Sequence, residues 1–159
     1  MNKTEAISKI LNVVESKVDM LRLARNTCFD FSEDFMDELK FRISEESIEK
    51  LNLYEFDDGS FYLGNTYDNK RRGFGFQYYN EGTMYMGEWY NNEKEGEGYY
   101  FKKYYCYHGE FKDSEFHGNG TIIGDGIFFW AEFRNGDIRY LNRANTSFIF
   151  NGKSYSETD

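Results

Sequence analysis

The chain has 159 residues, about the size of one domain, and its formal net charge is -9 at pH 7. Acidic residues outnumber basic residues both in residues 1–53 and in residues 54–159. This acidity disfavours binding of nucleic acid, or of an anionic membrane lipid, through the overall electrostatic field. The first residues lack an unbroken apolar core, and no stretch reaches the roughly 20 apolar residues of a membrane span. We therefore expect a cytoplasmic protein.

The cysteines Cys28 and Cys106 belong to no Cys-x-x-Cys motif, and no histidine cluster lies near either in sequence. A disulfide between them is the less favoured alternative, since a reducing compartment fits this cysteine usage better. We expect no metal and no cofactor.

The aromatic residues divide the chain near residue 53. They make up 20% of the sequence, yet only four precede Tyr54: Phe29, Phe31, Phe35 and Phe41. The sequence therefore predicts an α+β chain, with a helical segment at residues 1–53 for docking or oligomerisation and a β-rich array at residues 54–159.

The first predicted helix begins at Asn2, which precedes Glu5 by three residues as in a capping box, with Thr4 as an alternative cap. Its apolar residues recur at spacings of four and three along one side of a helix that ends near residues 25–27: Ile7, Leu11, Val14, Val18 and Leu21. This helical seam either packs on the chain's own domain or contacts a partner through a coiled coil or a groove.

A second helix is predicted over residues 32–43, with Ser32 as its cap. Its inward-facing residues are Phe35, Met36, Leu39 and Ile43. Ser44 is predicted to cap a third short piece that holds Ile48 and Leu51.

A repeat runs through the β-rich part, because Tyr-x-Gly and Gly-x-Gly each recur at steps of 23 and 22 residues. The residues that keep this phase are Tyr62, Gly64, Gly73, Gly75, Tyr85, Gly87, Trp89, Gly96, Gly98, Tyr107, Gly109, Phe111, Gly118 and Gly120. A Glu-aromatic pair follows at Glu88, Glu110 and Glu132. The copies lie near 59–81, 82–103 and 104–125, with a partial fourth near 126–140.

Each copy is typical of two short strands, with "NNEKE" as one of the polar turns. Such hairpins are stable only when stacked on one another. The period of two places the tyrosines, the glycines and Trp89 on one face. The segment "SFIFNGKSY" is predicted to be a last hairpin that caps the open edge of the sheet.

The glycines of the repeat are predicted to be structural. Glycine in a strand costs roughly 0.5 to 1 kcal/mol relative to alanine, but it leaves bare backbone on which a ring can lie flat. A buried ring removes about 150 to 250 Å² from water, and at about 25 cal/mol per Å² this outweighs the cost of glycine. A dinucleotide fingerprint would need a third glycine that opens a helix, whereas strand-like aromatics follow here.

The pattern Tyr-x-Gly-x-aromatic, a polar turn and Gly-x-Gly resembles the MORN (membrane occupation and recognition nexus) repeat, over roughly Gly59 to Gly136. The resemblance implies a single-layer antiparallel sheet of stacked MORN-type β-hairpins. It also implies a non-catalytic scaffold or adaptor in a cytoskeletal, ciliary or membrane-associated assembly. Some arrays of this kind dimerise, so a homodimer is one alternative.

The sequence contains no catalytic motif, and we expect no enzymatic activity. His117 is predicted to be a turn residue, and His108 lies on the strand face opposite Tyr107. The basic residues Lys70, Arg71, Arg72, Lys102 and Lys103 are predicted to be solvated loop charges. A phosphoinositide or membrane-surface binding module, in which basic turns meet lipid headgroups, is the alternative function.

The second face of the predicted sheet is also apolar, so something must cover it. The helices of residues 1–53 could fold over it, or a protein partner could dock there. The tentative partner-binding face consists of Phe61, Leu63, Met84, Met86, Phe128 and Trp130.

Overall fold

The structure is a computed structural model that describes residues 1–159 except 18, 21–30, 81, 125 and 157–159, and except the side chains of residues 31–34. The described helices include α1 (Lys3–Ser16), α3 (Phe31–Arg42) and α4 (Glu45–Glu49). Nine antiparallel strands then pair in sequence order: β1 (Asn52–Glu55), β2 (Phe61–Tyr67), β3 (Lys70–Asn80), β4 (Thr83–Tyr90), β5 (Glu93–Phe101), β6 (Tyr105–Lys112), β7 (Glu115–Gly124), β8 (Phe128–Arg134) and β9 (Asp137–Ala144). The fold is thus a helical segment followed by a sheet of consecutive hairpins, and the predicted α+β class is confirmed at that level.

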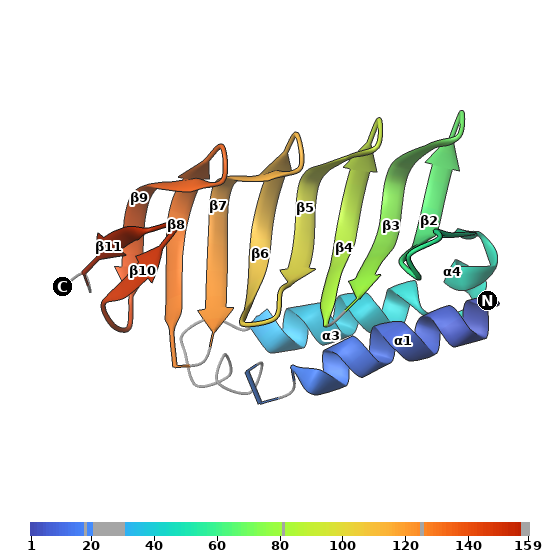
Figure 1. Ribbon diagram of the computed structural model, residues 1–159, viewed down its shortest axis with the longest axis horizontal. Helices are drawn as coiled ribbons and strands as arrows, with labels where there is room; N and C mark the ends of the chain where they lie inside the picture. Colours follow the sequence, from blue (N-terminus) through green and yellow to red (C-terminus); the bar gives the residue numbers. More distant parts are fainter. Residues whose placement is uncertain (18, 21–30, 81, 125, 157–159) are drawn as a thin grey trace.

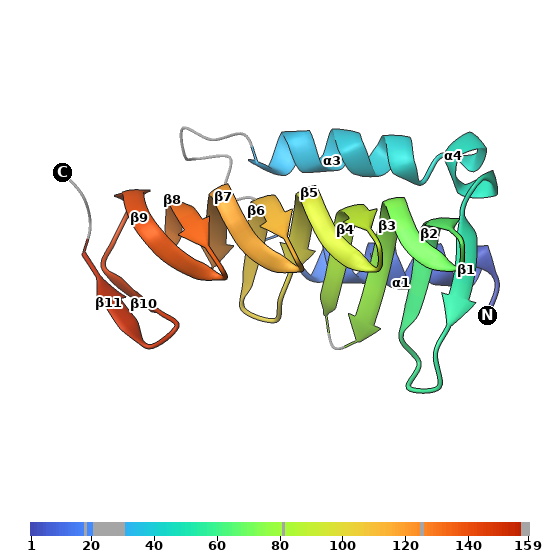
Figure 2. The same ribbon diagram turned by 90° about the horizontal axis from the view of Figure 1, so that it is seen from above.

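Figure 1 shows the strands side by side, with α1 and α3 running across one end of them. In Figure 2 the sheet is a single layer, and the separate hairpin of β10 (Phe148–Phe150) and β11 (Lys153–Tyr155) lies at its far end.

Two-residue turns connect the strands of each repeat. Asn91 and Asn92, with φ angles of 53° and 69°, form the turn between β4 and β5. Both lie in the left-handed region that hairpin turns of this length require and that asparagine tolerates. The predicted turn "NNEKE" was therefore too long, because Glu93, Lys94 and Glu95 already belong to β5.

Helix α1 begins as predicted, since the Asn2 side chain accepts a hydrogen bond of 2.8 Å from the Glu5 amide. It ends at Ser16, however, and not near residues 25–27. Helix α3 begins at Phe31, so Ser32 lies inside its first turn and not at its cap. Ser44 caps α4 as predicted, accepting a hydrogen bond from the Ser47 amide.

The predicted helical seam is rotated relative to the observed one. Leu11 is 40% exposed and Ile7 is half-buried, whereas Val14 is buried as expected. The buried stripe of α1 is made of Ala6, Ile10, Val13 and Val14. Alanine lets the helix backbone approach its neighbours closely, a feature that a search for large apolar residues overlooks. Val18 and Leu21 lie outside the described residues.

A row of glycines crosses the sheet perpendicular to the strands. The strand register places one glycine of each of six consecutive strands opposite the next: Gly64, Gly75, Gly87, Gly98, Gly109 and Gly120, followed by Ala131. The row ends where the fourth copy of the repeat carries alanine.

Tyrosine rings cover this row, as the sequence predicts. A Cβ added to Gly87 or to Gly109 would lie 2.5 or 2.6 Å from the hydroxyl of the tyrosine two residues before it. Each ring is held at its tip, because Tyr85 donates a hydrogen bond of 2.8 Å to the Glu88 carbonyl, and Tyr107 does the same to Glu110. Tyr62 donates to the Asn65 carbonyl at 2.7 Å. The glycines are therefore structural.

The two faces of the sheet support separate cores. On the tyrosine face, the rings bury one another, as where Tyr107 stacks on Phe116 with centroids 3.8 Å apart. The hairpin of β10 and β11 closes the end of this core, because Phe148 stacks on Phe129 with centroids 4.1 Å apart. The predicted last hairpin is confirmed, but it forms its own two-stranded sheet and does not pair with β9.

Candidate functional site: a groove between helix α3 and the sheet

The predicted partner-binding face is the chain's own core. Phe61, Leu63, Met84 and Met86 are fully buried, and Phe128 is 8% exposed. They share one core with buried residues of α1 and α3, and the half-buried Trp130 packs against that core. Of the two alternatives, the helices cover most of this face, so the six residues do not together form an open docking surface; Met86 and Trp130 each line a cavity at its border.

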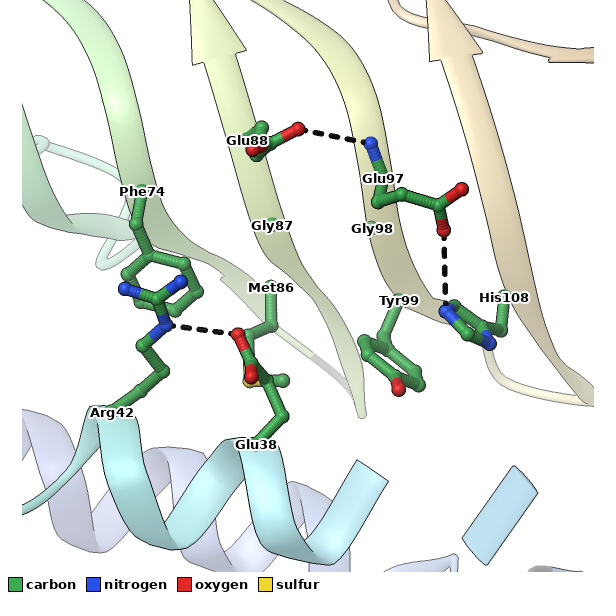
Figure 3. Close-up of a pocket in the computed structure, with 10 residues that line it drawn as sticks. All are labelled: Glu38, Arg42, Phe74, Met86, Gly87, Glu88, Glu97, Gly98, Tyr99 and His108. Carbon is green, nitrogen blue, oxygen red and sulfur yellow. Dashed lines mark hydrogen bonds and ion pairs between the residues drawn. The ribbon is translucent and has the colours of Figure 1, made fainter. Parts of the chain in front are cut away.

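The strip of the same face beyond α3 is not filled. A cavity of about 250 Å³ lies there, between Glu38 and Arg42 of α3 and residues of β3 to β6. Its floor includes Gly87 and Gly98 of the glycine row, and Arg42 lies over the Phe74 ring at 4.0 Å (Figure 3).

A second cavity of about 390 Å³ continues along the row, past Gly109, Gly120 and Ala131 to Asn142 on β9. Both cavities are lined by Glu97 and His108. The two cavities therefore adjoin at these two residues, and we refer to them together as a groove that crosses the strands from β3 to β9.

Carboxylates form one rim of this groove. The Glu88 carboxylate accepts a hydrogen bond of 3.2 Å from the Glu97 amide on the next strand, and Glu110 accepts one of 2.9 Å from the Asn119 amide. Gly96 and Gly118, with φ angles of 70° and 59°, precede those amides, and a Cβ there would collide with the carboxylates. The first glycine of the second and third Gly-x-Gly pairs thus makes room for a glutamate, whereas Gly73 of the first pair faces Asn65.

His108 and Glu97 lie where the two cavities meet. The His108 ring stacks on Tyr99, with centroids 4.0 Å apart and ring planes 4° apart, and its Nε2 lies 3.4 Å from the Glu97 carboxylate. Burial lowers the pKa of His108 to about 4, although the Glu38 carboxylate opposes this shift. The ring is therefore neutral at pH 7, and the contact with Glu97 becomes an ion pair only after protonation. Burial raises the pKa of Glu97, and Glu110 and Glu88 add to this effect.

We expect the shifted pKa of His108 to make the protein less stable in acid. Between pH 6.5 and about 4, the unfolded chain binds a proton that the folded chain does not, so the free energy of unfolding falls as the pH falls. Relative to His108→Gln, the wild-type protein should lose about 2 kcal/mol between pH 7 and pH 4.5 in urea titrations. The comparison of the two proteins removes the contribution of the carboxyl groups that both contain. If the free energy of unfolding of the two proteins depended on pH in the same way, the assigned pKa shift would be contradicted.

The basic residues of the lipid alternative do not form one exposed patch. Lys70, Arg71 and Arg72 lie in β3 and not in a loop. The Arg71 guanidinium donates to Gln77 and to Asn92, while Arg72 lies over the rings of Tyr67 and Tyr90 at the hairpin ends. His117 likewise lies in β7 and not in a turn. Lys102 and Lys103 do lie in a loop.

Among the described residues, no three His, Cys, Asp or Glu side chains are grouped so that they could hold a metal ion. Cys106 is a free, buried thiol whose pKa burial raises to about 12, and Cys28 lies outside the described residues. In the part of the chain that the structure describes, no helix is long and apolar enough to cross a membrane.

No protein-family model matches the chain, and a search of curated proteins found no match.

Proposed function

We propose that this protein is a non-catalytic scaffold or adaptor of the MORN type that binds a segment of another protein. The regular recurrence of Tyr-x-Gly and Gly-x-Gly, and the nesting of each tyrosine on a glycine pair, support the repeat assignment. The proposed cytoskeletal or ciliary assembly follows from the resemblance alone, and the proposed cytoplasmic location rests on the sequence features described above.

The binding surface that we propose is the groove between α3 and the carboxylate rim. The observation that carries this proposal is that Glu88 and Glu97 line a groove whose floor includes glycines, with Glu110 opposite Glu97 on the next strand. Bare backbone admits an extended chain, and carboxylates on one rim favour lysine or arginine side chains in that chain. The partner is therefore an extended segment with basic residues.

Binding of phosphoinositides is the weaker alternative. It requires free basic side chains at the turns, whereas Arg71 and Arg72 are held by neighbouring side chains. The acidic net charge of the chain also opposes an anionic surface.

A fluorescence-anisotropy titration tests the groove. The probes are labelled Gly/Ser peptides of equal length with either no lysine or several lysines. We expect only the lysine peptide to bind, and to bind more weakly as salt rises. Glu97→Lys should weaken this binding roughly three- to tenfold, because it replaces a negative charge in the groove with a positive one. The side chain of Glu97 is 64% exposed, so the exchange leaves the core unchanged.

Glu115→Lys supplies the matched control, since this exposed residue lies at the start of β7, away from the groove lining. Equal binding of both peptides, or equal loss in the two variants, would contradict the groove as the binding surface.

A further inference from the structure

Three cations gather on the tyrosine face, the side of the sheet opposite the groove. The Arg71 guanidinium lies 4.4 Å from the Trp89 ring centroid, and the Lys94 ammonium lies 5.7 Å from the same centroid. Lys94 and Lys102 in turn share the Tyr100 ring, at 5.0 and 5.3 Å. The two shared rings make this cationic cluster of Arg71, Lys94 and Lys102 continuous.

Lys94 is the unusual member of the cluster. It is only 8% exposed, and its ammonium lies within 6 Å of four ring centroids, those of Tyr79, Tyr85, Trp89 and Tyr100. Its ammonium donates no hydrogen bond to any residue that the structure describes, and only its backbone amide does, to the Ser114 hydroxyl. Since no fully buried side-chain nitrogen among those residues lacks a partner, the ammonium retains contact with solvent.

The cluster holds more positive than negative charge. Within the described ranges, none of its three cations forms an ion pair with a carboxylate. The adjacent Glu93 carboxylate accepts a hydrogen bond from the Ser114 hydroxyl. Burial, and then the charge of Arg71, lower the pKa of Lys94 to about 8. A buried cation without an anion is costly unless something supplies one.

We propose that this cluster binds a carboxylate of an acidic peptide segment. The Lys94 ammonium is the central contact and Lys102 lies beside it, while Arg71 adds positive charge and stays bonded to Gln77 and Asn92. The rings of Tyr79 and Tyr100 flank the ammonium and provide surface for an apolar or aromatic residue next to the carboxylate.

The recessed position of Lys94 indicates that its ligand is a projecting peptide side chain and not a membrane surface. A flat bilayer would have to approach a chain whose net charge is -9, whereas a single carboxylate can reach a recessed ammonium at less electrostatic cost. This inference does not depend on the groove, because the two surfaces lie on opposite faces of the sheet.

Trp89 can report the binding, since it contacts both Arg71 and Lys94. In a Trp130→Phe background it is the only tryptophan of the chain. The probes are the blocked tripeptide Glu-Phe-Glu, its neutral counterpart Gln-Phe-Gln, inorganic phosphate, and vesicles that contain anionic lipid. We expect a saturable change of Trp89 fluorescence with Glu-Phe-Glu and at least tenfold weaker binding of Gln-Phe-Gln.

Lys94→Met should weaken binding of Glu-Phe-Glu at least tenfold while the chain stays folded, because methionine keeps the apolar stem and removes the unpaired charge. Lys112→Met, at the exposed end of β6, should have no effect. If Lys94→Met does not fold, Lys102→Gln replaces it, with an expected loss of about threefold.

Three results would overturn the proposal: no saturable response to Glu-Phe-Glu, an equal response to Gln-Phe-Gln, or a preference for phosphate or vesicles over the peptide. The last of these would assign the cluster to a phosphorylated ligand or a lipid headgroup.

Discussion

Gly98→Ala is expected to destabilise the protein by about 3 kcal/mol or more, although it adds one methyl group to a strand. The new Cβ would lie 2.7 Å from the Cζ atom of Tyr85, well inside the contact distance of two carbon atoms. Tyr85 is fully buried and its hydroxyl is bonded to the Glu88 carbonyl, so the ring cannot move aside without losing both its packing and its hydrogen bond. Urea denaturation followed by circular dichroism measures the change.

The same substitution should become almost neutral once the ring is removed. In a Tyr85→Ala background, Gly98→Ala should cost less than about 0.5 kcal/mol, or even stabilise, because alanine is otherwise the better strand residue. Gly136→Ala is the control: nothing lies within 4 Å of its Cβ, and only its φ of 83° opposes the change, at a cost of about 1 kcal/mol. Additive effects of the Tyr85 and Gly98 substitutions would refute the nesting of the ring.

Met86→Asp should unfold the chain or come close to it. Met86 is fully buried between the sheet and the helical segment, so aspartate would place an unpaired carboxylate in that core. We expect a loss of about 4 kcal/mol or more, against a total stability of about 5 to 15 kcal/mol for a typical domain.

Met86→Leu is the conservative comparison and should cost less than about 1.5 kcal/mol. On the helical side of the same core, Leu39→Ala should cost about 2 to 5 kcal/mol, since Leu39 of α3 is 1% exposed. A stable, fully folded Met86→Asp variant would mean that the helices do not cover this face and would restore it as a docking surface.

The sheet was predictable from the sequence because its repeat fixes both register and face. Tyr85 and Gly87 are two residues apart, so they must share a face of a strand, and the common phase of the copies aligns their glycines across the strands. The two faces and the nested rings therefore follow from spacing alone.

What covers the second face could not be predicted, because docking of the helices depends on three-dimensional fit and not on period. The apolar spacing selected Leu11, while the close contact is made by Ala6, which no hydrophobic pattern marks. The contacts of Phe35 on α3 with the rings of Tyr99 and Phe101 likewise join residues that are far apart in sequence.

The groove was missed even though part of its signal is in the sequence. Glu88 and Glu110 keep the phase of the repeat, but the repeat pattern alone assigns them no further role. Their role depends on the backbone amides that the left-handed glycines expose on the next strand. The polar composition of "NNEKE" predicts a turn at Lys94, whereas Lys94 lies in β5 among the rings.

Proton NMR tests the central claim most directly, namely that tyrosine rings lie flat on the glycine row of one continuous sheet. The account predicts that the Hα resonances of Gly75, Gly98 and Gly120 shift strongly upfield, because each lies beneath a tyrosine ring. It also predicts nuclear Overhauser contacts from these protons to the rings of Tyr62, Tyr85 and Tyr107, respectively. Glycine resonances at ordinary positions, without contacts to those rings, would contradict it.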